Sequence, residues 1–301
     1  MTQHLLKITD VTKDELMDLL DDAKIMKQQV KEGVPHPHLA GKTLGMIFEK
    51  ASTRTRVSFE VGMTQLGGHA IFLSSKDMQL GRGESVHDTA KVLSRYVDGV
   101  MIRTFGHDMV ESFAAHSDVP VINGLTDEHH PTQVLADLMT IQEHKGTLEG
   151  LTMAFIGDGN NNMTHSLIQG AVLSGMNMHV ASPEGYEPDA GVWKEAEASG
   201  TVFFSHDPSE AVKEADVVVT DVWTSMGSES ETEGRLKAFE GYQVNEALMS
   251  SAAADALFLH CLPAHRGEEV SAGVIDGPQS AVFDEAENRL HAQKALLKKL
   301  L

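Results

Sequence analysis

Apolar residues along the chain alternate between helical spacing and short continuous runs. Thr12 and Glu15 form a capping box, the apolar residues after them recur every three or four positions, and Gly33 follows as a stop signal. This pattern predicts a first helix that runs to about Glu32. Apolar runs then alternate with helical segments, which is typical of parallel βαβ units. The predicted strands lie at 43–48, 69–73, 98–103, 119–123, 151–156, 177–181, 201–204, 216–220 and 256–260.

These strands fall into two series. A helical segment from His130 to His144 separates the first four predicted strands from the last five. The 301 residues also suit two domains of about 150 residues each. We therefore expect an α/β fold with two doubly wound parallel-sheet domains joined by a linking helix. The expected domains are 1–147 and 148–283, and a C-terminal helix at 284–301 is expected to pack back on the first domain.

The charge of the chain excludes several classes of partner. Acidic residues number 44 and basic residues 24, which gives a formal net charge of −20. Such a chain repels nucleic acid and anionic membranes, so neither is an expected partner. No apolar segment approaches the roughly 20 residues that cross a bilayer, and the amino terminus lacks the features of a signal peptide. With one cysteine, Cys261, no intrachain disulfide is possible. We expect a soluble cytoplasmic protein.

One strand-to-helix junction carries several anion-binding groups. The segment 48–56, FEKASTRTR, ends a predicted strand and opens a helix, whose first N–H groups are free to bind an anion. The hydroxyls of Ser52, Thr53 and Thr55 and the guanidinium of Arg54 are donors that suit a phosphate. The junction therefore predicts a phosphate site. The alternative is an ordinary Ser/Thr helix cap with exposed arginines.

Further polar residues follow other predicted strands. Arg103 ends one strand, where it is a second candidate anion ligand or a surface ion-pair partner. His130 and Gln133 open the linking helix and can bind a carbonyl or amide group, or they can cap the helix in solvent. Asn162 stands where the third glycine of a dinucleotide-binding pattern would lie, so the glycine-rich turn at 157–159 does not support NAD binding.

The second half of the chain offers groups that suit an amino acid. Asp221 follows a predicted strand and could hold an ammonium group, and the loop with Ser225 and Met226 could offer backbone groups. Cys261 is either a small buried hydrophobe or part of a nucleophile pair with His260. Neighbouring residues on a strand point to opposite faces, which argues against the pair. The 16 histidines show no paired metal spacing, so no metal site is expected.

Several segments together resemble one enzyme family. FEKASTRT is similar to the signature of the aspartate/ornithine carbamoyltransferases, and DVWTSMG and HCLPAHRGEE resemble its ornithine branch. HPTQVLAD, GDGNNNM and FDEAENRLHAQKA occur in the order expected for the family. The resemblance thus extends from the first predicted helix to the last.

The resemblance implies an activity and a set of site residues. The reaction is transfer of the carbamoyl group of carbamoyl phosphate to the δ-amine of L-ornithine, which gives L-citrulline and phosphate without a cofactor. The implied carbamoyl phosphate ligands are Ser52, Thr53, Arg54, Thr55, Gln79, Arg103, His130, Gln133, Cys261, Leu262 and Arg289. The implied ornithine ligands are Asn162, Asp221, Ser225 and Met226. The implied catalytic residues are Arg54, Arg103, His130, Asp221 and Cys261.

The resemblance also implies self-association. The expected assembly is a homotrimer or a multiple of it, in which the loop carrying Gln79 reaches a neighbouring site. The enzyme would act in arginine biosynthesis or, in reverse, in citrulline breakdown. Two alternatives stay open: a carbamoyltransferase for another amine, such as putrescine or N-acetylornithine, and a metabolite-binding protein without catalytic activity.

Overall fold

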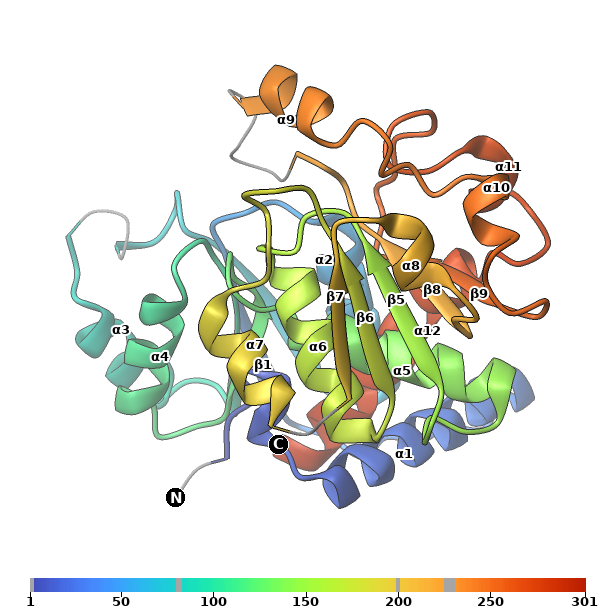
Figure 1. The fold of residues 1–301 in the computed structure, drawn as a ribbon. Helices are drawn as coiled ribbons and strands as arrows, with labels where there is room; N and C mark the ends of the chain where they lie inside the picture. Colours follow the sequence, from blue (N-terminus) through green and yellow to red (C-terminus); the bar gives the residue numbers. More distant parts are fainter. Residues whose placement is uncertain (1–2, 80–82, 199–200, 225–230) are drawn as a thin grey trace. The chain divides into compact units, whose positions relative to one another are not determined.

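The chain folds into two compact units. The computed structural model describes residues 3–79, 83–198, 201–224 and 231–301 (Figure 1). One unit comprises Met1–Met139 and Glu287–Leu301, and the other comprises Thr140–Ala286. We call them unit 1 and unit 2. Both divisions fall inside helices, so the domain bounds expected at the helix ends stay a prediction.

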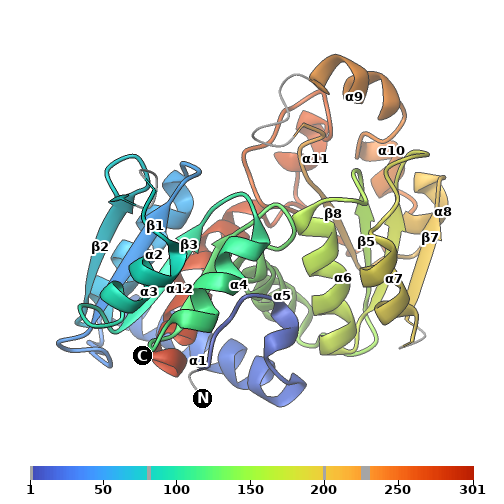
Figure 2. The ribbon, with the colours of Figure 1, turned by 90° about the vertical axis from the view of Figure 1, so that its left-hand side faces the viewer.

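Unit 1 contains a four-stranded parallel sheet with the order β2-β1-β3-β4. Figure 2 shows β2, β1 and β3 side by side. The strands are β1 (Thr43–Phe48), β2 (His69–Ser74), β3 (Gly99–Arg103) and β4 (Val121–Leu125). The helical segments before and between them are η1 (Ile8–Asp10), α1 (Lys13–Glu32), α2 (Thr53–Gln65), α3 (Val86–Leu93) and α4 (His107–His116).

The capping residues of α1 explain its bounds. The side chain of Thr12 accepts a hydrogen bond from the backbone N–H of Glu15, and the Glu15 carboxylate accepts one from the N–H of Thr12. Gly33 ends the helix in the left-handed conformation at a φ of 68°, which favours glycine. The first helix predicted from the sequence is thus confirmed at both ends.

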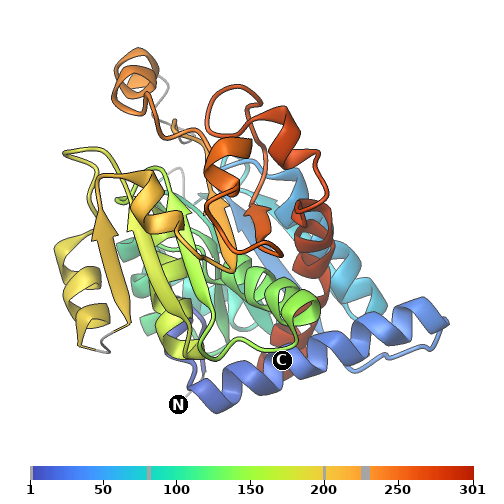
Figure 3. The ribbon, with the colours of Figure 1, turned by 45° about the vertical axis from the view of Figure 1, so that its right-hand side comes forward.

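The last helix, α12 (Val282–Leu300), packs on α1 of unit 1. Lys298 Nζ lies 2.8 Å from the carboxylate of Asp22, and Lys27 Nζ donates to Asn288 Oδ1 at 2.7 Å. Figure 3 shows the two helices, α1 in blue and α12 in red. The expected return of the C-terminal helix to the first half of the chain is confirmed.

Unit 2 contains a five-stranded parallel sheet with the order β7-β6-β5-β8-β9. Figure 1 shows α6 and α7 on one face of this sheet. The strands are β5 (Thr152–Ile156), β6 (Asn177–Ala181), β7 (Val202–Ser205), β8 (Val217–Thr220) and β9 (Leu257–His260). The helices are α6 (Asn162–Ser174), α7 (Ala190–Glu197), α8 (Pro208–Val212), α9 (Thr232–Ala238), α10 (Glu246–Met249) and α11 (Ala272–Ile275), and α5 (Pro131–Lys145) runs through the division between the units. The predicted fold class, two doubly wound parallel sheets, is confirmed.

The strand orders locate the candidate sites. In a doubly wound sheet, ligands bind beyond the carboxyl ends of the strands at the point where the strand order reverses. That point lies between β1 and β3 in unit 1 and between β5 and β8 in unit 2. Among the described residues, no helix has the length and apolar character that a membrane span requires.

Candidate functional site

The predicted anion site lies at the amino terminus of α2. Ser52 caps the helix: its Oγ accepts from the backbone N–H of Thr55 at 3.2 Å and lies 3.1 Å from Thr55 Oγ1. β1 and β3 are in register at their ends, where Phe48 pairs with Arg103. The segment after Phe48 and the buried Arg103 side chain therefore lie at neighbouring strand ends, as the sequence predicted.

Arg289 of α12 connects this helix terminus to α5. Its Nη1 donates to Gln133 Oε1 at 2.7 Å, and its Nη2 donates to Thr55 Oγ1 at 3.0 Å. The Gln133 amide in turn donates to Asp137 Oδ1 at 2.8 Å. One buried guanidinium thus fixes two predicted carbamoyl phosphate ligands. Asp137 was not identified from the sequence, although its position one helical turn after Gln133 is the spacing at which such pairs form.

His130 lies among positive charges. Burial, the largest cause, and the charges of Arg289, Arg103 and Arg54 hold the pKa of His130 well below its usual value. The side chain is therefore neutral at physiological pH and still has one N–H donor. The same three arginines are close enough to His130 to act on it, so the structure brings together four of the predicted ligands in unit 1.

Three further contacts support the loops around this cluster. Lys50 forms an ion pair with Asp127, and its Nζ lies 4.3 Å from the centre of the Phe105 ring. The hydroxyl of Thr104 donates to the carboxylate of Glu49. All of these residues except Asp127 lie close to Ser52 or Arg103 in the sequence, but the sequence alone gave no sign that they contact one another.

Gln79 is the predicted ligand on the segment that follows β2. It is exposed on the segment between β2 and α3, where its backbone carbonyl accepts from the N–H of Glu84 at 3.1 Å. In the part of the chain that the structure describes, no recorded contact joins its side chain to the start of α2. Its expected role in a neighbouring copy stays a prediction.

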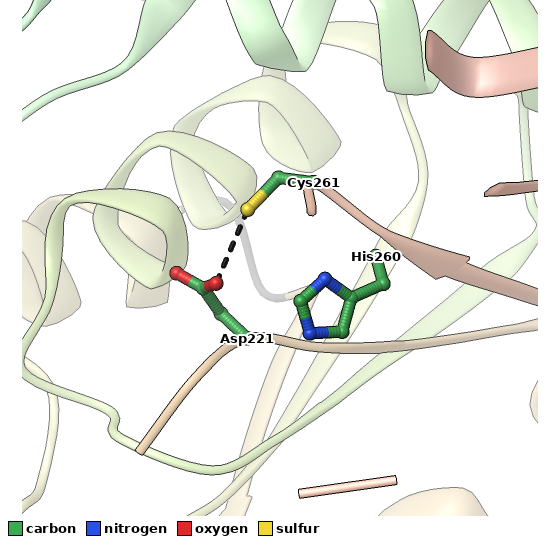
Figure 4. Close-up of side chains that lie close together, drawn as sticks. All are labelled: Asp221, His260 and Cys261. Atoms are coloured by element: carbon green, nitrogen blue, oxygen red, sulfur yellow. Dashed lines mark hydrogen bonds between the residues drawn. The ribbon is translucent and has the colours of Figure 1, made fainter. Parts of the chain in front are cut away.

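In unit 2, Asp221 and Cys261 meet because they follow adjacent strands. Thr220 of β8 pairs in register with His260 of β9, so the next residue on each strand lies beside the other. The Cys261 thiol donates to Asp221 Oδ1 at 3.1 Å (Figure 4). The backbone N–H of Val222 donates to the same oxygen at 2.8 Å.

The environment of Asp221 disfavours its charged form. Burial is the largest cause and raises the pKa of Asp221, while His260 and the hydrogen bonds from Cys261 and Val222 act in the opposite direction. A bound ammonium group would add a positive charge beside the carboxylate and stabilise the ionised form. The arrangement therefore suits a cationic ligand.

His260 holds the loop that carries Cys261 and Leu262. The N–H of Leu262 donates to His260 Nδ1 at 2.9 Å, so the proton of the neutral ring is assigned to Nε2, which lies 3.2 Å from Glu269 Oε1. A His260 nitrogen also lies within 4.8 Å of the Cys261 sulfur. β9 ends at His260, so Cys261 lies outside the strand. The thiol donates to Asp221 and the His260 nitrogens face Leu262 and Glu269, so whether Cys261 and His260 form a nucleophile pair stays untested.

The remaining predicted ornithine ligands are only partly described. Asn162 is the first residue of α6, and the cap itself is Asn161, whose Oδ1 accepts from the N–H of Thr164 at 2.9 Å. Because Asn161 makes the capping bond, Asn162 is not the residue that caps the helix. Ser225 and Met226 lie outside the described residues.

Among the described residues, two groups each hold three possible metal ligands, whose ligand atoms lie within 4.8 Å of one another. They are Asp221, His260 and Cys261, and His265, Glu268 and Glu269. In the first group both ring nitrogens of His260 are already within hydrogen-bond distance of partners, and a metal would have to displace one of them. The second group includes side chains at the surface, where such clusters commonly occur without an ion. We assign a metal to neither, and the expectation of a reaction without metal stays a prediction.

Comparison with known proteins also divides the chain into two parts. Residues 3–143 match the family described as "Aspartate/ornithine carbamoyltransferase, carbamoyl-P binding domain", and residues 149–300 match its "Asp/Orn binding domain". A protein of Carboxydothermus hydrogenoformans named ornithine carbamoyltransferase is 60% identical over 99% of this chain and 97% of its own. One of the same name from Oceanobacillus iheyensis is 59% identical over 99% of this chain and 94% of its own.

Solved structures show the same similarity in three dimensions. The ornithine carbamoyltransferase of Pyrococcus furiosus superposes with a TM-score of 0.94 at 55% identity, covering 98% of this chain and 96% of that one. The enzyme of Burkholderia thailandensis gives 0.92 at 50% identity, with coverage of 99% and 98%. With both family descriptions matched and full-length relatives at these identities, the chain belongs to the aspartate/ornithine carbamoyltransferase family.

Proposed function

We propose that this protein is an ornithine carbamoyltransferase, which transfers the carbamoyl group of carbamoyl phosphate to the δ-amine of L-ornithine and releases L-citrulline and phosphate. The observation that carries the proposal is the cluster of Arg54, Arg103 and Arg289 around the neutral His130, beside the amino terminus of α2. It concentrates positive charge in a chain of net charge −20. The names of the full-length relatives favour ornithine as the acceptor over putrescine or N-acetylornithine.

The α2 terminus would hold the phosphate group of the substrate. Backbone N–H groups of the first helical turn, the hydroxyls of Ser52, Thr53 and Thr55 and the guanidinium of Arg54 supply donors to its oxygens. Arg103, at the adjacent strand end, would bridge the phosphate and the carbonyl oxygen. The capping geometry of Ser52 supports this role.

The carbonyl oxygen gains negative charge as the amine attacks. Arg103 and the N–H of His130 would donate hydrogen bonds to it. The low pKa of His130 keeps the imidazole neutral, so the ring donates a hydrogen bond as an uncharged group. Removal of one such donor typically reduces the rate about a hundredfold or more. Gln133, held by Arg289, would bind the amide of the carbamoyl group, as would the main-chain carbonyls of Cys261 and Leu262.

Asp221 would bind ornithine through an ammonium group, together with Asn162, Ser225 and Met226. The δ-amine attacks only as the neutral form, although a free alkylammonium has a pKa of about 10.4. One proton leaves this nitrogen before the attack, a C–N bond forms, and the bond from the carbonyl carbon to the phosphate oxygen breaks. A second proton then leaves the nitrogen and is taken up by the departing phosphate. Phosphate departs with the electron pair. The Cys261 thiol, hydrogen-bonded to Asp221, would help to stabilise the charge near the δ-nitrogen as its protons leave.

We further propose a cytoplasmic homotrimer in which Gln79 serves a neighbouring copy. Exposed apolar side chains on α2 and on β2 support contact between copies: Val57 is 51% exposed and Ile71 39%, and β2 is an edge strand of its sheet. Light scattering after size exclusion should give about three times the chain mass of 32.6 kDa. A monomer would contradict this assignment.

The activity is tested with four acceptors in parallel: L-ornithine, putrescine, N-acetylornithine and L-aspartate, each with carbamoyl phosphate and with its own ureido product measured. A clear preference for ornithine is expected. Turnover with another acceptor would keep the carbamoyl phosphate half of the proposal and overturn the ornithine half. Binding of carbamoyl phosphate by folded protein without any turnover would favour a metabolite-binding protein.

A further inference from the structure

Arg235, a residue of α9, joins three separate segments of unit 2. Its Nη2 forms an ion pair with the carboxylate of Asp158, and its Nε donates to the backbone carbonyl of Trp223. The guanidinium carbon also lies 4.9 Å from the centre of the Tyr186 ring and 5.4 Å from that of Phe239. Only 12% of the Arg235 side chain is exposed, so these contacts are largely protected from solvent.

Asp158 connects the ion pair to the turn before Asn162. Asp158 Oδ1 accepts from the N–H of Asn160 at 2.9 Å, and its backbone carbonyl accepts from Thr164 Oγ1 at 2.6 Å. The carboxylate therefore contacts Arg235 with one oxygen and shapes the β5–α6 turn with the other.

Close packing makes this turn intolerant of change. A side chain at Gly159 would bring its Cβ within 2.5 Å of the Tyr186 carbonyl oxygen. The absence of a side chain thus allows the Tyr186 segment to lie directly against the turn. The Tyr186 ring then lies beside the Arg235 guanidinium, and the two observations describe one packed unit.

The contact with Trp223 connects Arg235 to Asp221. Trp223 lies two residues after Asp221, is buried, and stacks on Phe239 with ring centres 5.7 Å apart at an angle of 20°. Its backbone carbonyl is fixed by Arg235, twelve residues later in the chain. The backbone that leaves Asp221 is therefore tied to the same guanidinium as the turn before Asn162.

We infer that Arg235 is a positioning residue for the amino acid substrate: it holds the segments of Asn162 and Asp221 in the arrangement that binds L-ornithine. The inference rests on the proposed function. Loss of the guanidinium leaves the carboxylate of Asp158 buried without its ion-pair partner, which is costly and favours rearrangement of the turn. None of the contacts of Arg235 described above involves a proposed carbamoyl phosphate ligand, so the two substrates should respond differently.

The test compares Arg235→Gln with the wild type. The KM for L-ornithine should rise roughly tenfold to a hundredfold, as expected when charged hydrogen bonds are lost, while the KM for carbamoyl phosphate stays within about twofold. Inhibition by L-norvaline, which has the α-amino acid end of ornithine but no δ-amine, should weaken in parallel. Arg266→Gln is the matched control, because Arg266 makes an exposed two-bond pair with Asp276 at 2.9 and 2.6 Å. It should change neither KM.

Asp158→Asn separates positioning from direct binding. If Arg235 positions the segments through Asp158, this variant should also raise the KM for ornithine, and the double variant should cost less than the two single effects combined. An unchanged KM for ornithine in Asp158→Asn would overturn the inference, since it would point to direct binding of the substrate by Arg235. An Arg235→Gln enzyme with the wild-type KM for ornithine would overturn it as well.

Arg235→Lys covers the case in which Arg235→Gln does not fold. Lysine keeps the charge but cannot present the planar fork to the Asp158 carboxylate and the Trp223 carbonyl together. A selective rise in the KM for ornithine would support the inference, and equal changes for both substrates would overturn it. Failure of the proposed function is seen separately, as absence of citrulline formation by the wild type.

Discussion

Replacement of Arg289 by methionine tests the brace between α12 and the carbamoyl phosphate ligands. The change removes the guanidinium but keeps an unbranched side chain that fills part of the same volume. Two hydrogen bonds from a charged donor are lost, at 2.7 Å to Gln133 and 3.0 Å to Thr55. At about 1.5–3 kcal/mol each, their loss amounts to about 3–6 kcal/mol if it appears fully in binding and catalysis.

Since about 1.4 kcal/mol corresponds to a factor of ten, kcat/KM for carbamoyl phosphate at saturating ornithine should fall by roughly 10²- to 10⁴-fold. Lys298→Met is the control on the same helix: its ion pair with Asp22 is about a third exposed and should contribute at most about 1 kcal/mol to stability and nothing to kinetics. Arg289→Lys has a single ammonium group in place of the two-pronged guanidinium. Its kcat/KM for carbamoyl phosphate should lie between those of the wild type and Arg289→Met. If kcat/KM of Arg289→Met stays within about tenfold of the wild type, Arg289 does not hold these ligands.

Three further outcomes are expected. Arg54→Ala should reduce turnover by about a hundredfold or more with an unchanged circular dichroism spectrum, and more than a tenth of wild-type activity would contradict its role. A Gln79→Ala chain mixed with an Arg54→Ala chain should regain activity in hybrid trimers, and no recovery after demonstrated subunit exchange would argue against action on a neighbour. Burial and nearby lysines lower the pKa of His291 to about 3, so the unfolded chain takes up a proton below about pH 6.5 that the folded chain refuses. The free energy of unfolding should therefore decrease as the pH is lowered, by about 2 kcal/mol from this group at pH 5. In urea unfolding, His291→Gln should lose less stability between pH 7 and pH 5 than the wild type. An equal loss in the two proteins would refute the assignment.

Local patterns in the sequence were enough to predict the main elements. The capping box at Thr12 and the stop at Gly33 gave both ends of α1, because capping depends on neighbouring residues. The strand expected at 119–123 instead spans Val121–Leu125. Pro120 has no N–H for a ladder, and an irregularity after Ile102 allows Leu125 to pair with β3. Apolar content alone does not show such pairing.

The candidate site also contains features that the sequence could predict and features that it could not. Side chains at strand ends, such as Arg103 and Asp221, could be predicted because parallel strands present their carboxyl ends at one edge. The pairs that hold the site could not: Arg235 contacts Asp158, and Arg289 contacts Thr55, across long stretches of chain. These contacts depend on tertiary packing, which leaves no local pattern in the sequence.

The discontinuity of unit 1 affects how the protein is made. The ribosome releases all of Thr140–Ala286 before it synthesises Glu287–Leu301, so the second unit along the chain is the first to have all its residues. The bonds of Arg289 to Thr55 and Gln133 can form only after that. A nascent chain stopped at residue 286 would have every residue of unit 2 and would lack a guanidinium of the anion-binding cluster. Because the Arg289 contacts need residues synthesised after unit 2, we expect a chain stopped at residue 286 to bind carbamoyl phosphate more weakly than the longer chain.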